Sequence, residues 1–509
     1  MATPAEKLAQ SLEVLKNIQN HKGIAVFKSS EISRTHKERL LNNGFIQEVI
    51  KGWYISANPN DTKGESTAWY TSFWSFCSTY LNNRFGDNWC VSPEHSISIH
   101  SGNWTVPQQL LIRASEASNN VTKLPHNTSI MDAVLSFPEE EIEITEGIRI
   151  YSLASALIFC SQDYFARNSI DTRTALSLIK DSSKILTILL DGGHSRIAGR
   201  LAGAFRNIGK DRIADDIIKT MKSAEYDVRE IDPFTDKTFT SSGRELSPYV
   251  SRLKIMWDKM RSDIIENFPK STGLSQSKDE LLKNIQDNYE TDAYHSLSIE
   301  GYQVTTDLIE KVTNGDWDPE NNKTDKELKN TLATRGYYLA FQEVKKSIEK
   351  LFIGENSGKI ADDDHGDWYR ALFSSSVTAG ILKRSDLAGY RTHQVYISQS
   401  SHIPLKSEGV RDAMPVLFEL LIEEENAAVR AVLGHFIFVY IHPYMDGNGR
   451  IARFLMNLML VSGGYPWTII PVEERDEYMK SLEEASVNQN IELFTRFIGK
   501  FVTKEMEKN

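Results

Sequence analysis

The stretch His442-Pro-Tyr-Met-Asp-Gly-Asn-Gly-Arg-Ile-Ala-Arg453 decides the fold of the C-terminal half of this chain. An apolar run over 429–441 precedes it, and a second run over 451–461 carries apolar residues at helical spacing. The stretch is therefore predicted to be a loop that leads into the N-terminus of a helix. Free backbone N–H groups and the helix dipole favour an anion at such a terminus, so a nucleotide phosphate chain is the natural occupant.

Glycines and a carboxylate give this loop part of its expected chemistry. Gly447 and Gly449 let the backbone approach a phosphate closely and adopt positive φ angles that most residues avoid. Asp446 supplies a hard oxygen ligand, which suits Mg²⁺ held between one carboxylate and phosphate oxygens.

A candidate base and two cations complete the stretch. Arg450 and Arg453 project from neighbouring positions of the new helix, so both can hold terminal phosphates. His442 can take a proton from an incoming hydroxyl near neutral pH. The stretch holds no cysteine or serine, which favours direct attack of a hydroxyl on phosphorus over a covalent enzyme intermediate.

The stretch resembles the Fic family signature, H-P-F/Y-x-D/E-G-N-G-R-x-x-R, and matches it at every defined position. Fic proteins mostly transfer AMP from ATP to a Ser, Thr or Tyr hydroxyl of a target protein. The resemblance implies that His442 is the general base and that Asp446 is the Mg²⁺ ligand. It also implies a phosphate site made of Gly447, Asn448, Gly449, Arg450 and Arg453. The alternative, a basic helix N-terminus without chemistry, is disfavoured by the length of the match.

Two further segments resemble parts of the same family. Residues 388–397 resemble the Fic flap, a β-hairpin that lies over the active site and pairs with the main chain of the target. Val395, Tyr396 and Ile397 form its expected strand beside the nucleotide, and an ordinary surface hairpin is the alternative. Tyr478 stands where the family has an adenine-side tyrosine, whereas Ser486 replaces the asparagine that often follows it.

A short motif upstream predicts self-inhibition. Ser296-Leu-Ser-Ile-Glu300-Gly301 resembles the inhibitory signature of the family, S/T-x-x-x-E-G/N. On a helix Ser296 and Glu300 share a face, and Gly301 is a C-terminal stop. The resemblance implies a salt bridge from Glu300 to Arg453, which denies this arginine to the γ-phosphate and leaves the α-phosphorus out of line. An exposed helix glutamate followed by a capping glycine is the alternative.

The composition is that of an ordinary globular protein. The chain has 509 residues, 40% hydrophobic and 25% charged, with a net charge of −11. This acidic balance disfavours a protein that coats nucleic acid or membrane with its whole surface. Cys77, Cys90 and Cys160 lack metal-binding spacing and are expected to be reduced. Neither a signal peptide nor a membrane-spanning run is evident, so a cytoplasmic location is predicted.

The N-terminal segment carries a helix, helix and two-strand pattern. Helices are predicted over 5–20 and about 34–41, and strands over 45–50 and 52–55. The pattern resembles the winged helix of abortive-infection antitoxins and related DNA-binding regulators. Six Lys or Arg and three Glu give 22–55 a net charge of +3, so Arg34, Lys37 and Arg39 are the candidate DNA-phosphate contacts. A protein-docking role of the same segment stays open.

Four segments are predicted along the chain. Residues 1–60 form the winged helix, 61–240 an α/β middle module without assigned activity, 241–281 a linker helix, and 282–509 the Fic domain with its inhibitory helix. Within the middle module, Ser92–His100 alternates like a strand. The predicted fold class is thus multidomain and mainly α, with an all-α Fic core and a β-hairpin flap.

Together these features predict a self-inhibited protein adenylyltransferase that uses ATP and Mg²⁺. Its partner is a protein with a target hydroxyl, and self-modification and homo-oligomers are left open. A Fic-type kinase and an enzyme that removes AMP with the help of Glu300 are alternatives within enzymes. A DNA-binding regulator whose Fic core senses nucleotide is the alternative outside enzymes.

Overall fold

The computed structural model describes residues 3–22, 26–59, 65–235, 247–271, 273, 277–314 and 329–508. The chain forms two compact units. The N-terminal unit holds residues 1–248 and 396–403, and the C-terminal unit holds residues 249–395 and 404–509. Helices dominate the described residues beside three small sheets, which confirms the multidomain, mainly α fold class. The predicted boundaries at 60/61 and 240/241 lie outside the described residues, so the four predicted segments remain a prediction.

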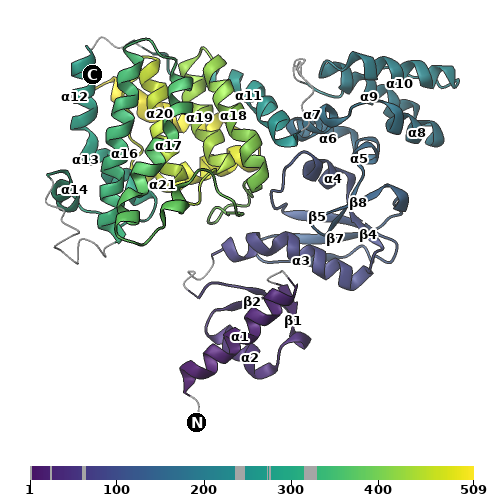
Figure 1. The fold of residues 1–509 in the computed structure, drawn as a ribbon. Coiled ribbons are helices and arrows are strands. Elements are labelled where there is room, and N and C mark those ends of the chain that lie inside the picture. Colours follow the sequence, from purple (N-terminus) through teal and green to yellow (C-terminus); the bar gives the residue numbers. More distant parts are fainter. Residues whose placement is uncertain are drawn as a thin grey trace. The chain divides into compact units, whose positions relative to one another are not determined.

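The N-terminal unit begins with a small module of helices and one antiparallel sheet, of order β1-β3-β2 (Figure 1). Ser33 begins the second helix because its side-chain oxygen accepts a hydrogen bond from the backbone N–H of His36. The predicted helices and strands are present within a few residues, while the winged-helix resemblance itself stays a prediction. The elements are α1 (Pro4–Lys22), β1 (Val26–Lys28), η1 (Ser29–Glu31), α2 (Arg34–Asn42), β2 (Ile46–Ile50) and β3 (Trp53–Ser56).

The three candidate DNA-binding cations are engaged within this module. Arg34 Nε lies 2.7 Å from a carboxylate oxygen of Glu38. Arg39 donates to Ser11 Oγ at 2.8 Å and thereby ties α2 to α1. The Lys37 ammonium lies 5.4 Å from the centre of an aromatic ring. Contact with DNA therefore stays a prediction.

A second sheet of order β4-β5-β7-β6 follows in the N-terminal unit, and its central pair, β5 and β7, is parallel. Helix α3 (Thr67–Phe85) packs against β3, β4 and β9 through the buried rings of Trp69, Phe73 and Phe76. The strands are β4 (Trp89–Val91), β5 (Gln109–Ala114), β6 (Val121–Lys123), β7 (Ser129–Val134), and the pair β8 (Ile142–Thr145) and β9 (Ile148–Tyr151), preceded by η2 (Glu139–Glu141).

Residues 93–100 form helix α4 (Pro93–His100), so the strand predicted from their alternation is wrong. The side chain of Ser92 accepts a hydrogen bond from the His95 N–H, and Pro93 occupies the first turn. Both are strong helix-start signals. A serine side chain caps a free backbone N–H at the helix start, and proline fits the first turn because an N–H there would have no partner within the helix. The alternating isoleucines, Ile97 and Ile99, are buried on the helix instead.

Short helices complete the N-terminal unit. They enclose a core of small and branched apolar residues that includes Leu157, Leu201, Phe205 and Ile217. The helices are α5 (Leu153–Phe159), α6 (Gln162–Arg167), α7 (Ser169–Leu178), α8 (Ser183–Gly192), α9 (Ser195–Asn207) and α10 (Asp211–Ser223).

The C-terminal unit is a bundle of helices without a described strand. Helices α16 to α20 pack side by side, and α19 and α20 are the apolar runs predicted on either side of the signature (Figure 1). Its elements are α11 (Pro248–Asn267), α12 (Lys278–Asp287), α13 (Tyr289–Ile299), α14 (Thr306–Thr313), α16 (Lys329–Leu351), α17 (Ser357–Thr378), η3 (Arg384–Leu387), α18 (Ser407–Glu423), α19 (Ala427–Ile441), α20 (Asn448–Ser462), η4 (Val472–Glu474), α21 (Arg475–Val487) and α22 (Glu492–Met506).

The predicted flap is present as a loop, and the expected β-hairpin is not formed. None of the described residues 388–406 lies in a strand, including Val395, Tyr396 and Ile397. Side chains donate hydrogen bonds to backbone carbonyl oxygens in this segment. For example, Gln394 Nε2 donates to Pro404 O at 2.8 Å. Residues 396–403 cluster with the N-terminal unit, where the Val106 N–H donates to the carbonyl oxygen of residue 401 at 2.9 Å.

Among the described helices, none is both long and apolar enough to cross a membrane. The three cysteines, Cys77, Cys90 and Cys160, are buried free thiols, in keeping with the predicted reduced state. Burial raises the pKa of the Cys90 thiol to about 12 and that of the Cys160 thiol to about 12, so both stay protonated and unreactive.

Candidate active site

The signature begins where α19 ends. His442 follows the last helical residue in a left-handed conformation, with φ 55° and ψ 61°. Its ring Nδ1 lies 3.2 Å from the carbonyl oxygen of Val439. A carbonyl oxygen can only accept, so this contact places the ring proton on Nδ1 and leaves the lone pair of Nε2 available.

The His442 side chain is half-buried. Desolvation lowers the pKa of the imidazole to about 4, against the opposing effect of the hydrogen bond to Val439. The ring is therefore neutral at pH 7, which is the form that can accept a proton from a hydroxyl.

The glycine-flanked turn that follows is held by a buried asparagine. Gly447 has φ 82°, and a β-carbon there would lie 2.9 Å from side-chain atoms of Leu372 and Phe373. The Asn448 side chain accepts from the Tyr444 N–H at 2.9 Å and donates to the Tyr444 carbonyl at 2.8 Å. Asn448 thus shapes the turn with its side chain, and only its backbone N–H is left to face an anion.

Asp446 stands at the surface of this turn, with 60% of its side chain exposed. Its Oδ1 accepts from the Gly447 N–H at 2.6 Å and from Arg450 Nη2 at 3.2 Å. An exposed carboxylate fits Mg²⁺, which keeps waters and takes few protein ligands. No group of three or more metal-binding side chains occurs among the described residues.

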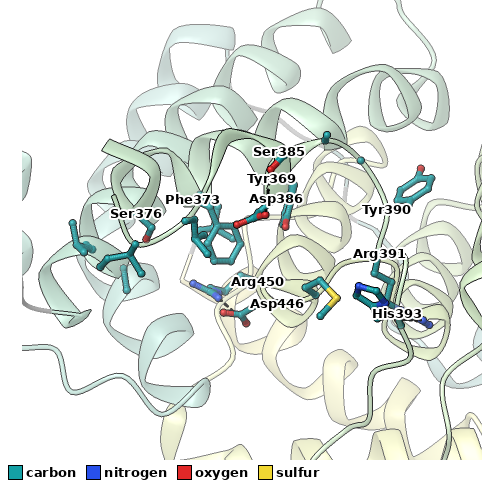
Figure 2. Close-up of a pocket in the computed structure, with 18 of the residues that line it drawn as sticks. Tyr369, Phe373, Ser376, Ser385, Asp386, Tyr390, Arg391, His393, Asp446 and Arg450 are labelled. Atoms are coloured by element: carbon teal, nitrogen blue, oxygen red, sulfur yellow. Dashed lines mark hydrogen bonds and ion pairs between the residues drawn. The ribbon is translucent and has the colours of Figure 1, made fainter. Parts of the chain in front are cut away.

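A cavity of about 600 Å³ opens beside Asp446 and Arg450. Figure 2 shows these two side chains together, with Phe373 near Arg450 and with Arg391 and His393 at one end of the cavity. The lining combines aromatic rings with charged groups, as expected for a site that takes a nucleotide or an aromatic side chain.

Arg450 is fixed between two rings. Its side chain is 1% exposed, and its guanidinium carbon lies 5.2 Å from the ring centre of Tyr302 and 5.3 Å from that of Phe373. A planar guanidinium stacks well on aromatic faces, and this arrangement fixes its orientation without a buried carboxylate. Tyr302 follows the predicted inhibitory motif directly, so this segment also contacts the arginine that is predicted to bind phosphate.

The predicted inhibitory motif contacts Arg453 through Ser296 and Glu300. Arg453 Nη2 lies 2.7 Å from Glu300 Oε1 and donates to the Ser296 carbonyl at 3.0 Å, while Nε donates to Ser296 Oγ at 2.9 Å. The arginine side chain is 5% exposed and that of Glu300 is 25% exposed. Gly301 has φ 83° after the last turn of α13, in agreement with its predicted role as a stop.

The Glu300 carboxylate also reaches the glycine turn. A β-carbon on Gly449 would lie 2.4 Å from Glu300 Oε1, so the carboxylate rests against the backbone at the start of α20. Burial alone would raise the pKa of Glu300, but Arg453 and Arg450 outweigh it and lower the pKa below its ordinary value. Glu300 is therefore an anion at neutral pH and occupies the place predicted for a phosphate.

Two buried guanidinium donors of the signature have no acceptor among the described residues. Arg453 Nη1 and Arg450 Nε lack a hydrogen-bond partner among the described residues. Arg453 Nη1 would lie 3.2 Å from a β-carbon on Gly449, so it faces the same turn as Glu300. Unpaired buried donors are costly, and an oxyanion with several oxygens would satisfy them better than one carboxylate.

Tyr478 is not at the surface of this site. Its side chain is 1% exposed, and its hydroxyl lies 2.8 Å from His435 Nε2 in the core. Burial lowers the pKa of His435 to about 3, so this histidine is neutral. The adenine contact predicted for Tyr478 stays a prediction.

Sequence reasoning missed the partners of the arginines. Tyr302 and Phe373 hold Arg450, and Arg391 contacts the backbone of His442. Tyr302 could have been suspected from its place after Gly301. Phe373 and Arg391 carry no local signal, because their roles arise only from the packing of α17 and the flap loop on the signature.

Comparison with known proteins gives one family match, to the Fic/DOC family over residues 364–460. A Nematostella vectensis protein named protein adenylyltransferase Fic is 25% identical over 260 residues, which cover 50% of this chain and 57% of that protein. The Drosophila melanogaster protein of the same name is 36% identical over 123 residues, 23% of this chain and 24% of that protein.

A solved structure of Fic-1 from Caenorhabditis elegans, residues 134–508, is 20% identical and covers 68% of this chain and 96% of that one. Its TM-score of 0.37 is too low to support a conclusion. The chain spans about half the length of the curated relatives it matches, with 57% of one and 41% of another covered. Residues 364–460, which hold the signature, α18, α19 and most of α17 and α20, are thus the part of this chain that matches the model of the Fic/DOC family.

Proposed function

We propose that this protein is a self-inhibited AMP transferase, which moves AMP from ATP to a Ser, Thr or Tyr hydroxyl of a protein. The names of its relatives, protein adenylyltransferase Fic, support this activity. A neutral His442, an exposed Asp446 and two arginines at one helix N-terminus supply the groups that such a transfer needs.

The position of the Glu300 carboxylate is the observation that carries the proposal. It lies 2.7 Å from Arg453 and against Gly449, so the protein itself fills an anion site next to the candidate base. A helix N-terminus with glycine turns and buried guanidinium groups suits a phosphate far better than a lone carboxylate. Glu300 therefore competes with the terminal phosphates of ATP.

In the proposed step the acceptor oxygen attacks the α-phosphorus of ATP. The new oxygen–phosphorus bond forms as the bond from the α-phosphorus to its bridging oxygen breaks, and diphosphate leaves. His442 Nε2 takes the hydroxyl proton, while the Nδ1–H contact to Val439 holds the ring in the required tautomer. Arg450, Arg453 and the backbone N–H groups of the turn stabilise the charge of the leaving diphosphate.

Mg²⁺ on Asp446 is part of this proposal. When bound, the cation would neutralise charge on the phosphate chain that leaves. The residue itself fits, since its carboxylate is exposed at the mouth of the cavity and one oxygen is held by the turn.

The test uses ATP labelled at the α-phosphate and, in parallel, at the γ-phosphate. The Glu300→Gly protein is incubated with each label, Mg²⁺ and a protein extract, with Glu300→Gly/His442→Ala as the matched control. We expect AMP-sized mass and α-label on protein, reduced at least about 100-fold by His442→Ala, since a positioned base contributes about 10²–10⁴.

Label from the γ-phosphate alone would instead make the protein a kinase. Equal α-label with and without His442 would remove the histidine from the mechanism. Absence of any transfer, with ATP still bound, would favour the regulator that senses nucleotide.

A further inference from the structure

Arg391 is a buried cation that is held without a carboxylate. Its side chain is 3% exposed, and burial lowers its pKa to about 10. In the part of the chain that the structure describes, no acidic group is within ion-pair distance of this guanidinium. Its hydrogen-bond acceptors are backbone carbonyl oxygens instead.

Three consecutive carbonyl groups at the end of α19 accept from Arg391. Its Nε donates to His442 O at 2.7 Å, its Nη2 to Ile441 O at 3.4 Å, and its backbone N–H to Pro443 O at 2.9 Å. The last carbonyls of a helix lack intrahelical donors and carry partial negative charge. This end of α19 therefore supplies the stabilisation that a carboxylate would otherwise give.

The same guanidinium contacts both stems of the flap loop, defined here as residues 394–404. Its Nη1 donates to His393 O at 3.0 Å, and its Nη2 donates to Leu405 O. Figure 2 shows Arg391 and His393 adjacent at the end of the cavity. One side chain thus joins the two ends of the flap loop to the first residue of the signature.

His442 needs this support because of its backbone conformation. A φ of 55° lies in the left-handed region, which residues with a β-carbon seldom adopt. Such a conformation persists only where neighbouring groups hold it in place. The conformation matters for chemistry because the ring contact from Nδ1 to Val439 O, which frees Nε2, depends on where the backbone directs the ring.

We propose that Arg391 is a positioning residue that holds the His442 backbone in its left-handed conformation and couples it to both stems of the flap loop. The inference rests on the proposed role of His442 as base. Arg391 acts through His442, so its loss reduces the rate of the chemical step rather than the binding of ATP. A rearrangement of the flap-loop stems is transmitted to the base through Arg391.

The first test compares Arg391→Lys with Arg430→Lys, both in the Glu300→Gly protein. Arg430 is a matched control because it is a half-buried arginine at the other end of α19, with hydrogen bonds to Glu424 O at 2.6 Å and Glu425 O at 3.0 Å. We expect Arg391→Lys to lower kcat about 100-fold with KM for ATP changed less than about twofold, because small misplacements of reacting groups cost about that much.

Arg430→Lys is expected to leave kcat and KM within about twofold of the parent. The proposal is overturned if Arg391→Lys keeps kcat within threefold, or if KM rises as much as kcat falls. It is also overturned if thermal melting shows that Arg391→Lys does not fold, since the role would then be the stability of the whole unit.

A second test needs no transfer activity and therefore separates this inference from the proposed function. In nitrogen-15 histidine spectra, the His442 signals are identified by their absence in His442→Ala. We expect a neutral ring with its proton on Nδ1 in the parent and a mixture of tautomers in Arg391→Lys. Identical His442 signals in both proteins, or a parent ring protonated on Nε2, would overturn the inference even in an active enzyme.

Discussion

Arg453 and Arg391 are both buried arginines beside the signature loop, and they are held in opposite ways. Arg453 is held from one helix, α13, by Glu300 Oε1 at 2.7 Å and by two oxygens of Ser296. Arg391 is held by backbone oxygens from three places in the chain, namely His393, Leu405 and His442.

The difference separates an exchangeable contact from a fixed one. A side-chain carboxylate can leave, and a phosphate can take its place on the same guanidinium. Backbone carbonyl groups at a helix end cannot move away from a guanidinium unless the helix end itself moves. We therefore assign substrate binding and its control to Arg453, and the geometry of the base to Arg391.

The largest expected effect comes from replacing Arg453, the cation of the exchangeable contact with Glu300. Arg453→Gln, with Glu300 in place, leaves a partly buried carboxylate without its partner and is expected to cost about 3–5 kcal/mol of unfolding free energy. For a unit of this size about 1 kcal/mol corresponds to 2–4 °C, so the melting temperature falls by roughly 10 °C. Differential scanning calorimetry of the full chain measures this shift.

Two controls belong to this measurement. Arg475→Gln removes another arginine that donates to α13, at 2.8 Å to Ile299 O, but without a buried carboxylate partner. It is expected to cost about 1 kcal/mol or less. The double variant Arg453→Gln/Glu300→Gln should recover about half of the loss. A double variant as unstable as Arg453→Gln alone would show that the unpaired charge of Glu300 is not the cause.

A smaller effect is expected for Asp292, a buried carboxyl group that anchors α13. Asp292 lies one turn before Ser296, is 5% exposed, and its Oδ2 accepts from the Tyr337 hydroxyl at 2.8 Å. Burial raises the pKa of this carboxyl to about 7. A raised folded-state pKa contributes stability that is fully present below the unfolded value of about 4 and is lost as pH rises to 7.

Asp292→Asn removes this titration and should keep an acceptor for the Tyr337 hydroxyl. Its melting temperature is expected to exceed that of the wild type by an amount that grows from pH 5 to pH 7 and then stays constant. Thermal melts in a pH series provide the measurement, with Asp307→Asn, an exposed position on α14, as the control. A difference between variant and wild type that does not change over pH 5–8 would contradict the buried-acid assignment.

The local chemistry of the site could be predicted from the sequence because it resides in two short motifs. Twelve consecutive residues placed the candidate base at the end of α19, the glycine turn after it, and both arginines in the first turns of α20, as the structure has them. The inhibitory motif predicted the contact of Glu300 with Arg453, which is present at 2.7 Å. In both cases the information is local, and helix geometry fixes the rest.

What the sequence could not predict depends on distant neighbours. The flap segment alternates like a strand, but none of the described residues forms a partner strand for it, and the Arg391 and Gln394 side chains donate to backbone carbonyl oxygens at its stems. The hydroxyl of Tyr478 on α21 lies 2.8 Å from Nε2 of His435 on α19, a contact that no local pattern in the sequence indicates. The error at α4 differs in kind, because Ser92 and Pro93 offered a local helix-start signal that the alternation obscured.

The most direct test is whether removal of the Glu300 carboxylate, which lies on Arg453, raises the rate of AMP transfer. The rate of AMP transfer is measured for wild type, Glu300→Gly and Glu290→Gln, the last an exposed glutamate of the same helix. The account predicts a rate about 10–100-fold above wild type for Glu300→Gly, in the range of typical couplings between sites, and no change for Glu290→Gln. Equal rates in wild type and Glu300→Gly would contradict it.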